Sequence, residues 1–168
     1  MKVSVIGAGT MGNGIAQVFA MNGHITTLLD ISEAALEKAK NTIASNLDRM
    51  IKKEVLTEAQ KASTLSNLTF ATNISTSVSD AELVVEAATE NVDLKLKIFK
   101  QLDESAPEHC ILATNTSSIS ITKIAAVTGR PDKIIGMHFM NPVPIMKLVE
   151  VIRGYNTSNE VTDKIMNL

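Results

Sequence analysis

The feature that most constrains the fold of this chain is a glycine cluster that directly follows a short apolar segment near the N-terminus. The segment KVSVI, residues 2–6, is rich in β-branched residues and predicts a buried strand. The next residues, Gly7-Ala8-Gly9-Thr10-Met11-Gly12, have the spacing G-x-G-x-x-G. Apolar residues then recur at helical spacing until Asn22-Gly23, and a second apolar run follows at residues 25–29. This order of strand, glycine turn, helix and strand predicts a βαβ unit with parallel strands.

The glycine cluster has the spacing that lets a backbone loop bind a pyrophosphate. Gly7 permits the tight turn, Gly9 lets the backbone approach the phosphates, and Gly12 lets the helix pack closely on the strand. Thr10 and Met11 occupy the positions between them at the helix N-terminus, where backbone amides and the helix dipole stabilise an anion. The sequence therefore predicts a dinucleotide cofactor in contact with these five residues.

An acidic residue follows where a ribose would lie. Asp30 comes at the end of the second predicted strand, 18 residues after Gly12. A carboxylate at this place accepts hydrogen bonds from a ribose hydroxyl and repels a 2′-phosphate, which favours NAD over NADP. The alternative is a glycine turn with a surface aspartate and no ligand, and the surrounding strand, helix and strand argue against it.

The rest of the chain predicts a Rossmann-type α/β fold with a doubly wound, mostly parallel sheet, in one domain over residues 1–168. Ser32 is an expected N-cap, and Thr57 with Gln60 matches a capping box. Two successive helices over about residues 32–66 predict a helical hairpin inserted into this fold. The other expected elements are strands at residues 68–71, 83–86, 111–113 and 134–137, an edge strand at residues 146–152, and a helix at residues 92–102.

Polar residues follow the predicted strands at one edge of the sheet. They are the glycine loop, Asp30, residues 86–90, Asn115-Thr116-Ser117-Ser118, and His138 with Asn141. Open α/β folds bind ligands at the carboxyl ends of their parallel strands. We therefore expect these five segments to converge on one crevice.

His138 is the candidate for proton transfer. An imidazole that titrates near neutrality can remove the hydroxyl proton when an alcohol passes a hydride to nicotinamide. A partly buried carboxylate at Glu150 would fix the tautomer of His138, and Ser117 could donate a hydrogen bond to the substrate oxygen. From position alone, a packed histidine at a strand end is an equal alternative for His138. His24 and His109 lie beside predicted helix ends, where a surface role is expected.

Composition excludes several classes of function. The 18 acidic and 16 basic side chains leave a formal charge of −2, so no basic surplus is available for binding nucleic acid. The single cysteine, Cys110, excludes a disulfide framework, and no cluster of residues has metal-ligand spacing. No apolar run approaches the roughly 18 residues of a membrane span, and the N-terminus lacks the layout of a signal peptide. A cytoplasmic location without membrane contact is therefore expected.

Longer segments of the sequence resemble a known family. VIGAGTMGNGIAQVFA, VVEAATE, ATNTSSISIT and IIGMHFMNPVPIMKLVEVI are similar to the NAD-binding domain of 3-hydroxyacyl-CoA dehydrogenases, above all the bacterial 3-hydroxybutyryl-CoA dehydrogenases. The resemblance covers nearly the whole chain, and H-F-x-N-P is its most specific part. It implies the reversible reaction of (S)-3-hydroxyacyl-CoA and NAD to 3-oxoacyl-CoA and NADH, and a place in fatty-acid or butyrate metabolism.

The resemblance also implies roles for individual residues. His138 would be the catalytic base, Glu150 the acid that orients it, and Ser117 a contact of the substrate oxygen close to the nicotinamide. Lys52 or Lys53, near the tip of the hairpin, would face the phosphates of CoA, although a solvated helix face is an equal alternative. The positions implied to contact NAD are Asp30, Glu90, Lys95, Asn115, Ser117 and Asn141.

Members of the family continue into a second, helical domain that closes over the acyl-CoA and supplies most of the dimer interface. The sequence ends at Leu168, near the expected start of that domain, so the C-terminal helical domain is expected to be absent. Because positioning of the substrate contributes strongly to catalysis, we expect NAD binding with little or no turnover by this chain alone. A dehydrogenase of small hydroxy acids and a non-catalytic dinucleotide-binding module are the alternatives.

Overall fold

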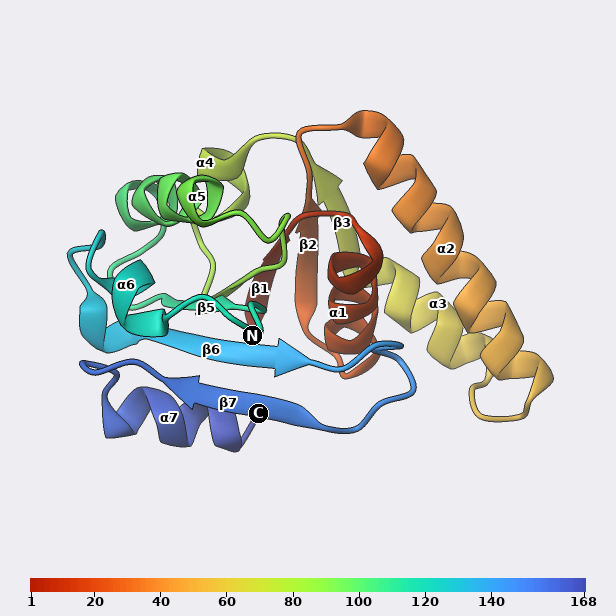
Figure 1. Ribbon diagram of the computed structural model, residues 1–168. Coiled ribbons are helices and arrows are strands. Elements are labelled where there is room, and N and C mark those ends of the chain that lie inside the picture. Colours follow the sequence, from red (N-terminus) through yellow and green to blue (C-terminus); the bar gives the residue numbers. More distant parts are fainter.

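The computed structural model describes residues 1–168 and contains one sheet with the strand order β3-β2-β1-β4-β5-β6-β7 (Figure 1). The first six strands are parallel, and β7 pairs antiparallel with β6. The strands are β1 (Lys2–Ile6), β2 (Ile25–Leu29), β3 (Leu68–Ala71), β4 (Leu83–Glu86), β5 (Ile111–Thr114), β6 (Ile134–Phe139) and β7 (Val149–Arg153). The parallel part has the order of a doubly wound dinucleotide-binding sheet, so the predicted Rossmann-type fold is confirmed.

Helices cover both faces of this sheet, and two of them form the predicted hairpin. They are α1 (Thr10–Met21), α2 (Glu33–Lys52), α3 (Glu58–Ser66), α4 (Ile74–Ser77), α5 (Val92–Ser105), α6 (Ile121–Ala125) and α7 (Asn159–Met166), with a 3-10 turn η1 at Pro131–Lys133. Figure 1 shows α2 and α3 side by side, projecting from the body of the molecule. Ser32 caps α2 by accepting the Ala35 N–H at 3.2 Å, and the capping box of Thr57 and Gln60 begins α3.

The apolar core consists of two clusters, one on each face of the sheet. On one face, Val5 and Leu28 pack with Ile15 of α1 and with the buried stripe of α2. On the other face, Leu112 packs with Phe99 of α5 and with Cys110. All six side chains are fully buried, as expected for parallel strands covered on both sides. Cys110 therefore packs as a small hydrophobic side chain in this cluster.

Some predicted boundaries are wrong near the C-terminus. β6 runs through Phe139, so His138 lies within the strand rather than after it. The edge strand begins at Val149 instead of residue 146, because a turn that closes on the Pro142 carbonyl occupies the residues before it. The helix α7 was not predicted, although Ser158 caps it by accepting the Val161 N–H. None of the helices combines the length and the apolar character of a membrane span.

Candidate functional site

The glycine loop between β1 and α1 places different demands on its three glycines. Gly7 has a φ of +100°, and a Cβ on it would lie 2.8 Å from the Ala87 carbonyl oxygen. A Cβ on Gly12 would lie 1.7 Å from the Gly7 carbonyl oxygen, so only glycine lets α1 begin against this turn. Nothing lies within 4 Å of a Cβ on Gly9. The fold therefore does not require a glycine at position 9. The open space beside Gly9 instead suits the close approach of a pyrophosphate to the backbone.

Asp30 joins the end of β2 to the glycine loop. Its Oδ2 accepts the Ala8 N–H at 2.8 Å, and its Oδ1 accepts the Ser32 N–H at 2.9 Å. An ionised carboxylate has about four acceptor positions, so positions remain for the two hydroxyls of a ribose. The half-buried side chain is thus held in place and can still bind a ligand. This geometry fits the predicted role of Asp30 in favouring NAD.

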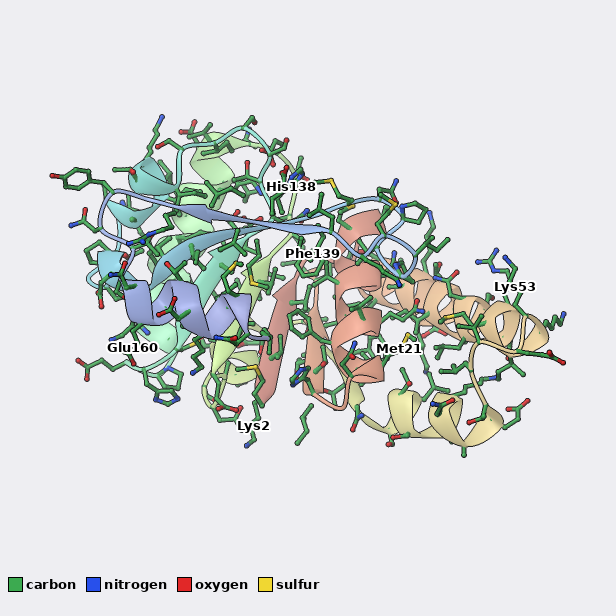
Figure 2. The ribbon with its side chains drawn as sticks, turned by 90° about the horizontal axis from the view of Figure 1, so that it is seen from below. Lys2, Met21, Lys53, His138, Phe139 and Glu160 are labelled. Atoms are coloured by element: carbon green, nitrogen blue, oxygen red, sulfur yellow. The ribbon has the colours of Figure 1, made fainter.

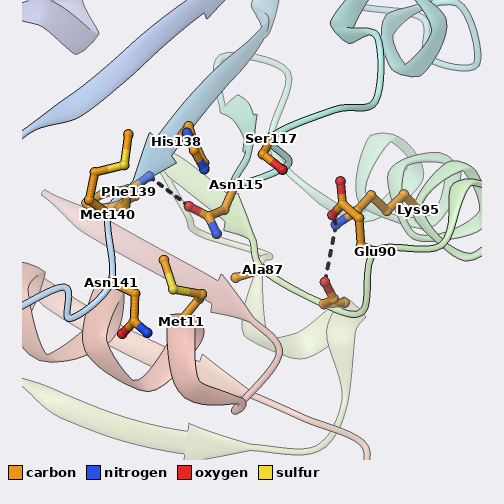
Figure 3. Close-up of a pocket in the computed structure, with 11 residues that line it drawn as sticks. Met11, Ala87, Glu90, Lys95, Asn115, Ser117, His138, Phe139, Met140 and Asn141 are labelled. Atoms are coloured by element: carbon orange, nitrogen blue, oxygen red, sulfur yellow. Dashed lines mark hydrogen bonds and ion pairs between the residues drawn. The ribbon is translucent and has the colours of Figure 1, made fainter.

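A pocket of about 380 Å³ lies at the carboxyl ends of β4, β5 and β6 (Figure 3). Its lining combines residues from the glycine loop and from the segments after these three strands. The lining residues are Met11, Ala87, Ala88, Glu90, Lys95, Asn115, Ser117, His138, Phe139, Met140 and Asn141. The predicted convergence of the polar segments is therefore observed for the residues at β4, β5 and β6. In this pocket Met11 and Asn141 lie opposite His138, Asn115 and Ser117 (Figure 3).

His138 is paired with Glu150 across the last two strands. The two residues are directly opposite in the antiparallel register of β6 and β7, and Nδ1 of His138 lies 2.8 Å from Oε2 of Glu150. Because a carboxylate only accepts hydrogen bonds, this contact places the hydrogen on Nδ1, so in a neutral imidazole Nε2 is the nitrogen with the lone pair. The expectation that Glu150 is partly buried is wrong: its side chain is 53% exposed, since β7 is the outermost strand.

Asn115 and Ser117 come from the loop after β5. Oδ1 of Asn115 accepts the backbone N–H of Phe139 at 2.8 Å, which fixes the orientation of the amide and leaves its Nδ2 as a free donor. Ser117 lines the pocket at β4, β5 and β6 and also the neighbouring groove that contains Glu150. His138 lines both spaces as well, so Ser117 and His138 share one region of the surface.

Glu90 and Lys95 form the end of the pocket at α5. Lys95 is 1% exposed, and its Nζ lies 2.7 Å from Oε1 of Glu86 and 3.4 Å from Oε2 of Glu90. Lys95 is therefore part of the pocket wall rather than a free surface amine. Burial alone would raise the pKa of Glu90, but the hydroxyl of Thr116 and the charge of Lys95 together hold it below its usual value. Glu90 is thus ionised at neutral pH.

Glu86 also belongs to this region, and no individual role was predicted for it. It is completely buried at the end of β4. The available signal was a single acidic residue at the end of the otherwise apolar segment Leu83–Glu86. Its partners, in α5 and β5, depend on the tertiary structure.

Lys52 and Lys53 are not brought to this pocket. Lys52 ends α2, Lys53 is the C-cap residue, and both are exposed. Figure 2 shows Lys53 at the outer end of the hairpin, away from His138. A second groove, of about 390 Å³, lies nearer the glycine loop. It is lined by Ala8, Gly9, Thr10, Asn13, Gly14, Ala35, Lys38, Ala39, Thr42, Asn46, Asn141, Pro142, Val143 and Pro144.

The residues present fit NAD. The glycine loop offers a backbone approach at Gly9, Asp30 keeps free acceptor positions, and Asn115 keeps a free donor. No group of three or more histidine, cysteine, aspartate or glutamate side chains is arranged to hold a metal ion.

Comparison with known proteins agrees with this geometry. Residues 2–168 match the family model described as "3-hydroxyacyl-CoA dehydrogenase, NAD binding domain". A 3-hydroxybutyryl-CoA dehydrogenase from Clostridioides difficile is 48% identical over 168 residues, which are the whole chain and 59% of that relative. The mitochondrial hydroxyacyl-coenzyme A dehydrogenase of Rattus norvegicus is 47% identical over 98% of the chain and 54% of its own length.

A solved structure matches the same part of the chain. The crystal structure of (S)-3-hydroxybutyryl-CoA dehydrogenase from Ralstonia eutropha superimposes with a TM-score of 0.96 at 54% identity, covering 99% of this chain and 58% of that one. The chain thus spans a little more than half the length of these relatives. By its sequence, fold and site, the chain belongs to the 3-hydroxyacyl-CoA dehydrogenase family, as an NAD-binding domain.

Proposed function

We propose that this chain is the cofactor-binding and proton-transfer part of an enzyme that interconverts (S)-3-hydroxyacyl-CoA and 3-oxoacyl-CoA, with 3-hydroxybutyryl-CoA as the expected substrate. The observation that carries the proposal is the pair of His138 and Glu150, which stands beside Ser117 at the pocket that adjoins the glycine loop. The names of the relatives from Clostridioides difficile and Ralstonia eutropha support the substrate class.

The side chains of the pocket have complementary roles in this reaction. NAD, when bound, supplies the acceptor for the hydride of the alcohol. His138 takes the hydroxyl proton at Nε2, and Glu150 stabilises the imidazolium that forms by accepting the hydrogen on Nδ1. In the opposite direction His138 returns the proton to the carbonyl oxygen. Ser117 donates a hydrogen bond to that same oxygen and so holds it near His138.

We expect the chain alone to bind NADH with little or no turnover of acetoacetyl-CoA. The match covers 59% of the Clostridioides difficile protein, so residues 1–168 correspond to only part of that relative. A substrate that lacks part of its binding surface is poorly oriented, and orientation accounts for a large share of an enzymatic rate. Lys52 and Lys53 remain predicted contacts of the CoA phosphates.

A chimeric enzyme tests the proposal. Residues 1–168 are joined to the remaining segment of the Clostridioides difficile relative, and NADH oxidation by acetoacetyl-CoA is followed at high and low substrate concentrations. We expect turnover, with a loss of about 100-fold or more in kcat for His138→Gln, because the group that protonates the carbonyl oxygen during reduction is removed. His109→Gln, which replaces an exposed histidine away from the pocket, is the matched control and should retain the rate.

Two outcomes would contradict the proposal. One is a chimera that binds NADH and folds but does not reduce acetoacetyl-CoA, which favours a non-catalytic dinucleotide-binding module. The other is a His138→Gln chimera with the full rate, which removes His138 from the reaction.

A further inference from the structure

Glu86 is a fully buried carboxylate beside the pocket that the proposed reaction does not use. Burial of a charge is costly unless its oxygens are hydrogen-bonded. Oε1 of Glu86 accepts the N–H of Ala88 and the Nζ of Lys95, each at 2.7 Å, and Oε2 accepts the hydroxyl of Thr114, also at 2.7 Å. These donors lie in the loop after β4, in α5 and in β5. Glu86 therefore joins three separate segments behind the pocket.

Lys95 connects Glu86 with the pocket surface. Its ammonium group has three hydrogens. It donates to Oε1 of Glu86 and to the Ala88 carbonyl oxygen at 3.2 Å, and it lies 3.4 Å from Oε2 of Glu90. Glu90 is 44% exposed and lines the pocket, whereas Glu86 and Lys95 are at most 1% exposed. A buried carboxylate and an exposed carboxylate thus share one buried cation.

Glu90 extends these contacts to the loop that contains Ser117. It accepts the hydroxyl hydrogen of Thr116, and it accepts that of Ser118 at 3.1 Å. Ser117 lies between these two residues and lines the same pocket. A change at Glu86 can therefore reach the pocket wall through Lys95 and Glu90 without direct contact with a ligand.

We propose that Glu86 is a positioning residue of the NAD site, acting through Lys95 and Glu90 on the nicotinamide half of the cofactor. Its complete burial means that it cannot touch the cofactor itself. Without the charge of Glu86, the ammonium of Lys95 keeps only Glu90 as a charged partner, on the solvent side. Lys95 is then drawn toward Glu90, and both residues leave the geometry that shapes the pocket end.

The position of Glu86 in the sheet limits its effect to one half of the cofactor. The order in which strands are added to the sheet reverses between β1 and β4. In doubly wound sheets a dinucleotide binds across this point. The glycine loop and Asp30 lie on the β1–β2 side, which binds the pyrophosphate and the adenosine ribose. Glu90, Asn115 and His138 lie at β4, β5 and β6, on the nicotinamide side. The proposed role of Glu86 rests on the proposed function, in which the nicotinamide of NAD binds at β4, β5 and β6.

Titrations with NADH and with ADP separate the two halves, because ADP carries only the adenosine and the pyrophosphate. For Glu86→Gln, which keeps the shape and removes the charge, we expect the dissociation constant of NADH to rise about tenfold or more, equivalent to about 1.4 kcal/mol. The dissociation constant of ADP should stay within about twofold of the wild type, a difference of about 0.4 kcal/mol. A purely global loss of structure would weaken the binding of both ligands.

A double-mutant cycle tests the path through Lys95. Lys95→Met should also weaken the binding of NADH, partly because it leaves the Glu86 carboxylate without its cation. The double substitution of Lys95→Met with Glu86→Gln should weaken NADH binding no more than the stronger single substitution does. The effects of residues that act as one unit do not add.

Asp103→Asn is the matched control. It removes a carboxylate from another ion pair of the same helix, in which Oδ1 of Asp103 lies 2.7 Å from Nε of Arg130. Neither Asp103 nor Arg130 lines the pocket. We expect Asp103→Asn to lower the Tm and to leave the NADH dissociation constant unchanged.

The proposal is overturned if Glu86→Gln binds NADH within about twofold of the wild type, if ADP is weakened equally, or if the effects of the two substitutions add. Should Glu86→Gln fail to fold, Thr114→Val is titrated in its place. It removes one of the three hydrogen bonds to Glu86, together with the longer bond, at 3.3 Å, that the Thr114 hydroxyl accepts from the Thr116 N–H. It should weaken NADH by about threefold or more, or about 0.7 kcal/mol, and unchanged NADH binding refutes the proposal. Wild-type chain that binds ADP but not NADH would contradict the nicotinamide site itself.

Discussion

Replacing Gly9 with alanine separates what the cofactor requires from what the fold requires. Gly9 is the N-cap residue of α1, with φ −69° and ψ −169°, an extended conformation that any residue adopts. A Cβ built on it meets no atom within 4 Å, whereas a Cβ on Gly12 would lie 1.7 Å from a backbone oxygen. The two glycines of one loop should therefore respond to the same substitution in opposite ways.

The stability of the folded chain should hardly change in Gly9→Ala. An alanine at a backbone position that accepts it gains about 0.4–1 kcal/mol by restricting the unfolded chain. Alanine is a poorer N-cap than glycine, by about 0.5–1 kcal/mol, which offsets this gain. The net change is within about 1 kcal/mol, or about 4 °C in Tm for a chain of this length. Gly12→Ala should instead lower the Tm strongly, because α1 must move away from the loop.

The affinity for NADH should fall in Gly9→Ala. The added methyl group occupies the space through which the loop approaches the pyrophosphate. Loss of a hydrogen bond to a charged group costs about 1.5–3 kcal/mol, which weakens binding by roughly 10- to 100-fold. Fluorescence titration with NADH and thermal unfolding followed by circular dichroism measure both quantities. NADH affinity within about twofold of the wild type, or a loss of Tm as large as that of Gly12→Ala, would refute this reasoning.

Three further predictions follow from single side chains. Burial raises the pKa of Cys110 to about 12, so a disulfide reagent at pH 8 should label it only after denaturant is added; rapid labelling of native chain would contradict its burial. The pKa of Glu90 is lowered in the folded chain, so this carboxylate contributes stability above its unfolded pKa and loses it as the pH falls through the lowered value. Glu90→Gln should therefore flatten the acid limb of the stability curve below about pH 4.5, and an unchanged limb measured by urea unfolding would exclude this effect. Asp30→Asn removes the charge that repels a 2′-phosphate and should raise the ratio of NADPH to NADH affinity about tenfold. An unchanged ratio in parallel titrations would show that residues other than Asp30 determine the preference for NADH over NADPH.

The parts of the fold that the sequence predicts correctly have local signals. The glycine loop needs residues without a Cβ at Gly7 and Gly12, and those positions can be recognised from spacing alone. The hairpin can be predicted from the caps at Ser32 and at Thr57 with Gln60, because each cap acts within one turn of its own helix. The register between strands then places the polar segments at one edge, because parallel strands share their carboxyl ends.

Other features depend on contacts between distant segments. Glu86 at the end of β4 forms an ion pair with Lys95 of α5. The apolar segment that ends at Glu86 contains no signal from which Lys95 could be predicted as the partner. The exposure of Glu150 depends on β7 being the outermost strand, which is a property of the whole sheet. The extension of β6 through His138 depends on pairing with β7, since the antiparallel partner continues the ladder past the apolar residues.

A crystal structure of the chain with NADH tests most directly whether the pocket at β4, β5 and β6 is the reaction site. We expect the pyrophosphate at Gly9, the adenosine ribose on Asp30, and the nicotinamide ring between Met11 and Asn115, with Nε2 of His138 open to a substrate beside the ring. A nicotinamide ring outside this pocket, for example in the groove beside α2, would contradict both the proposed role of His138 and the proposed role of Glu86.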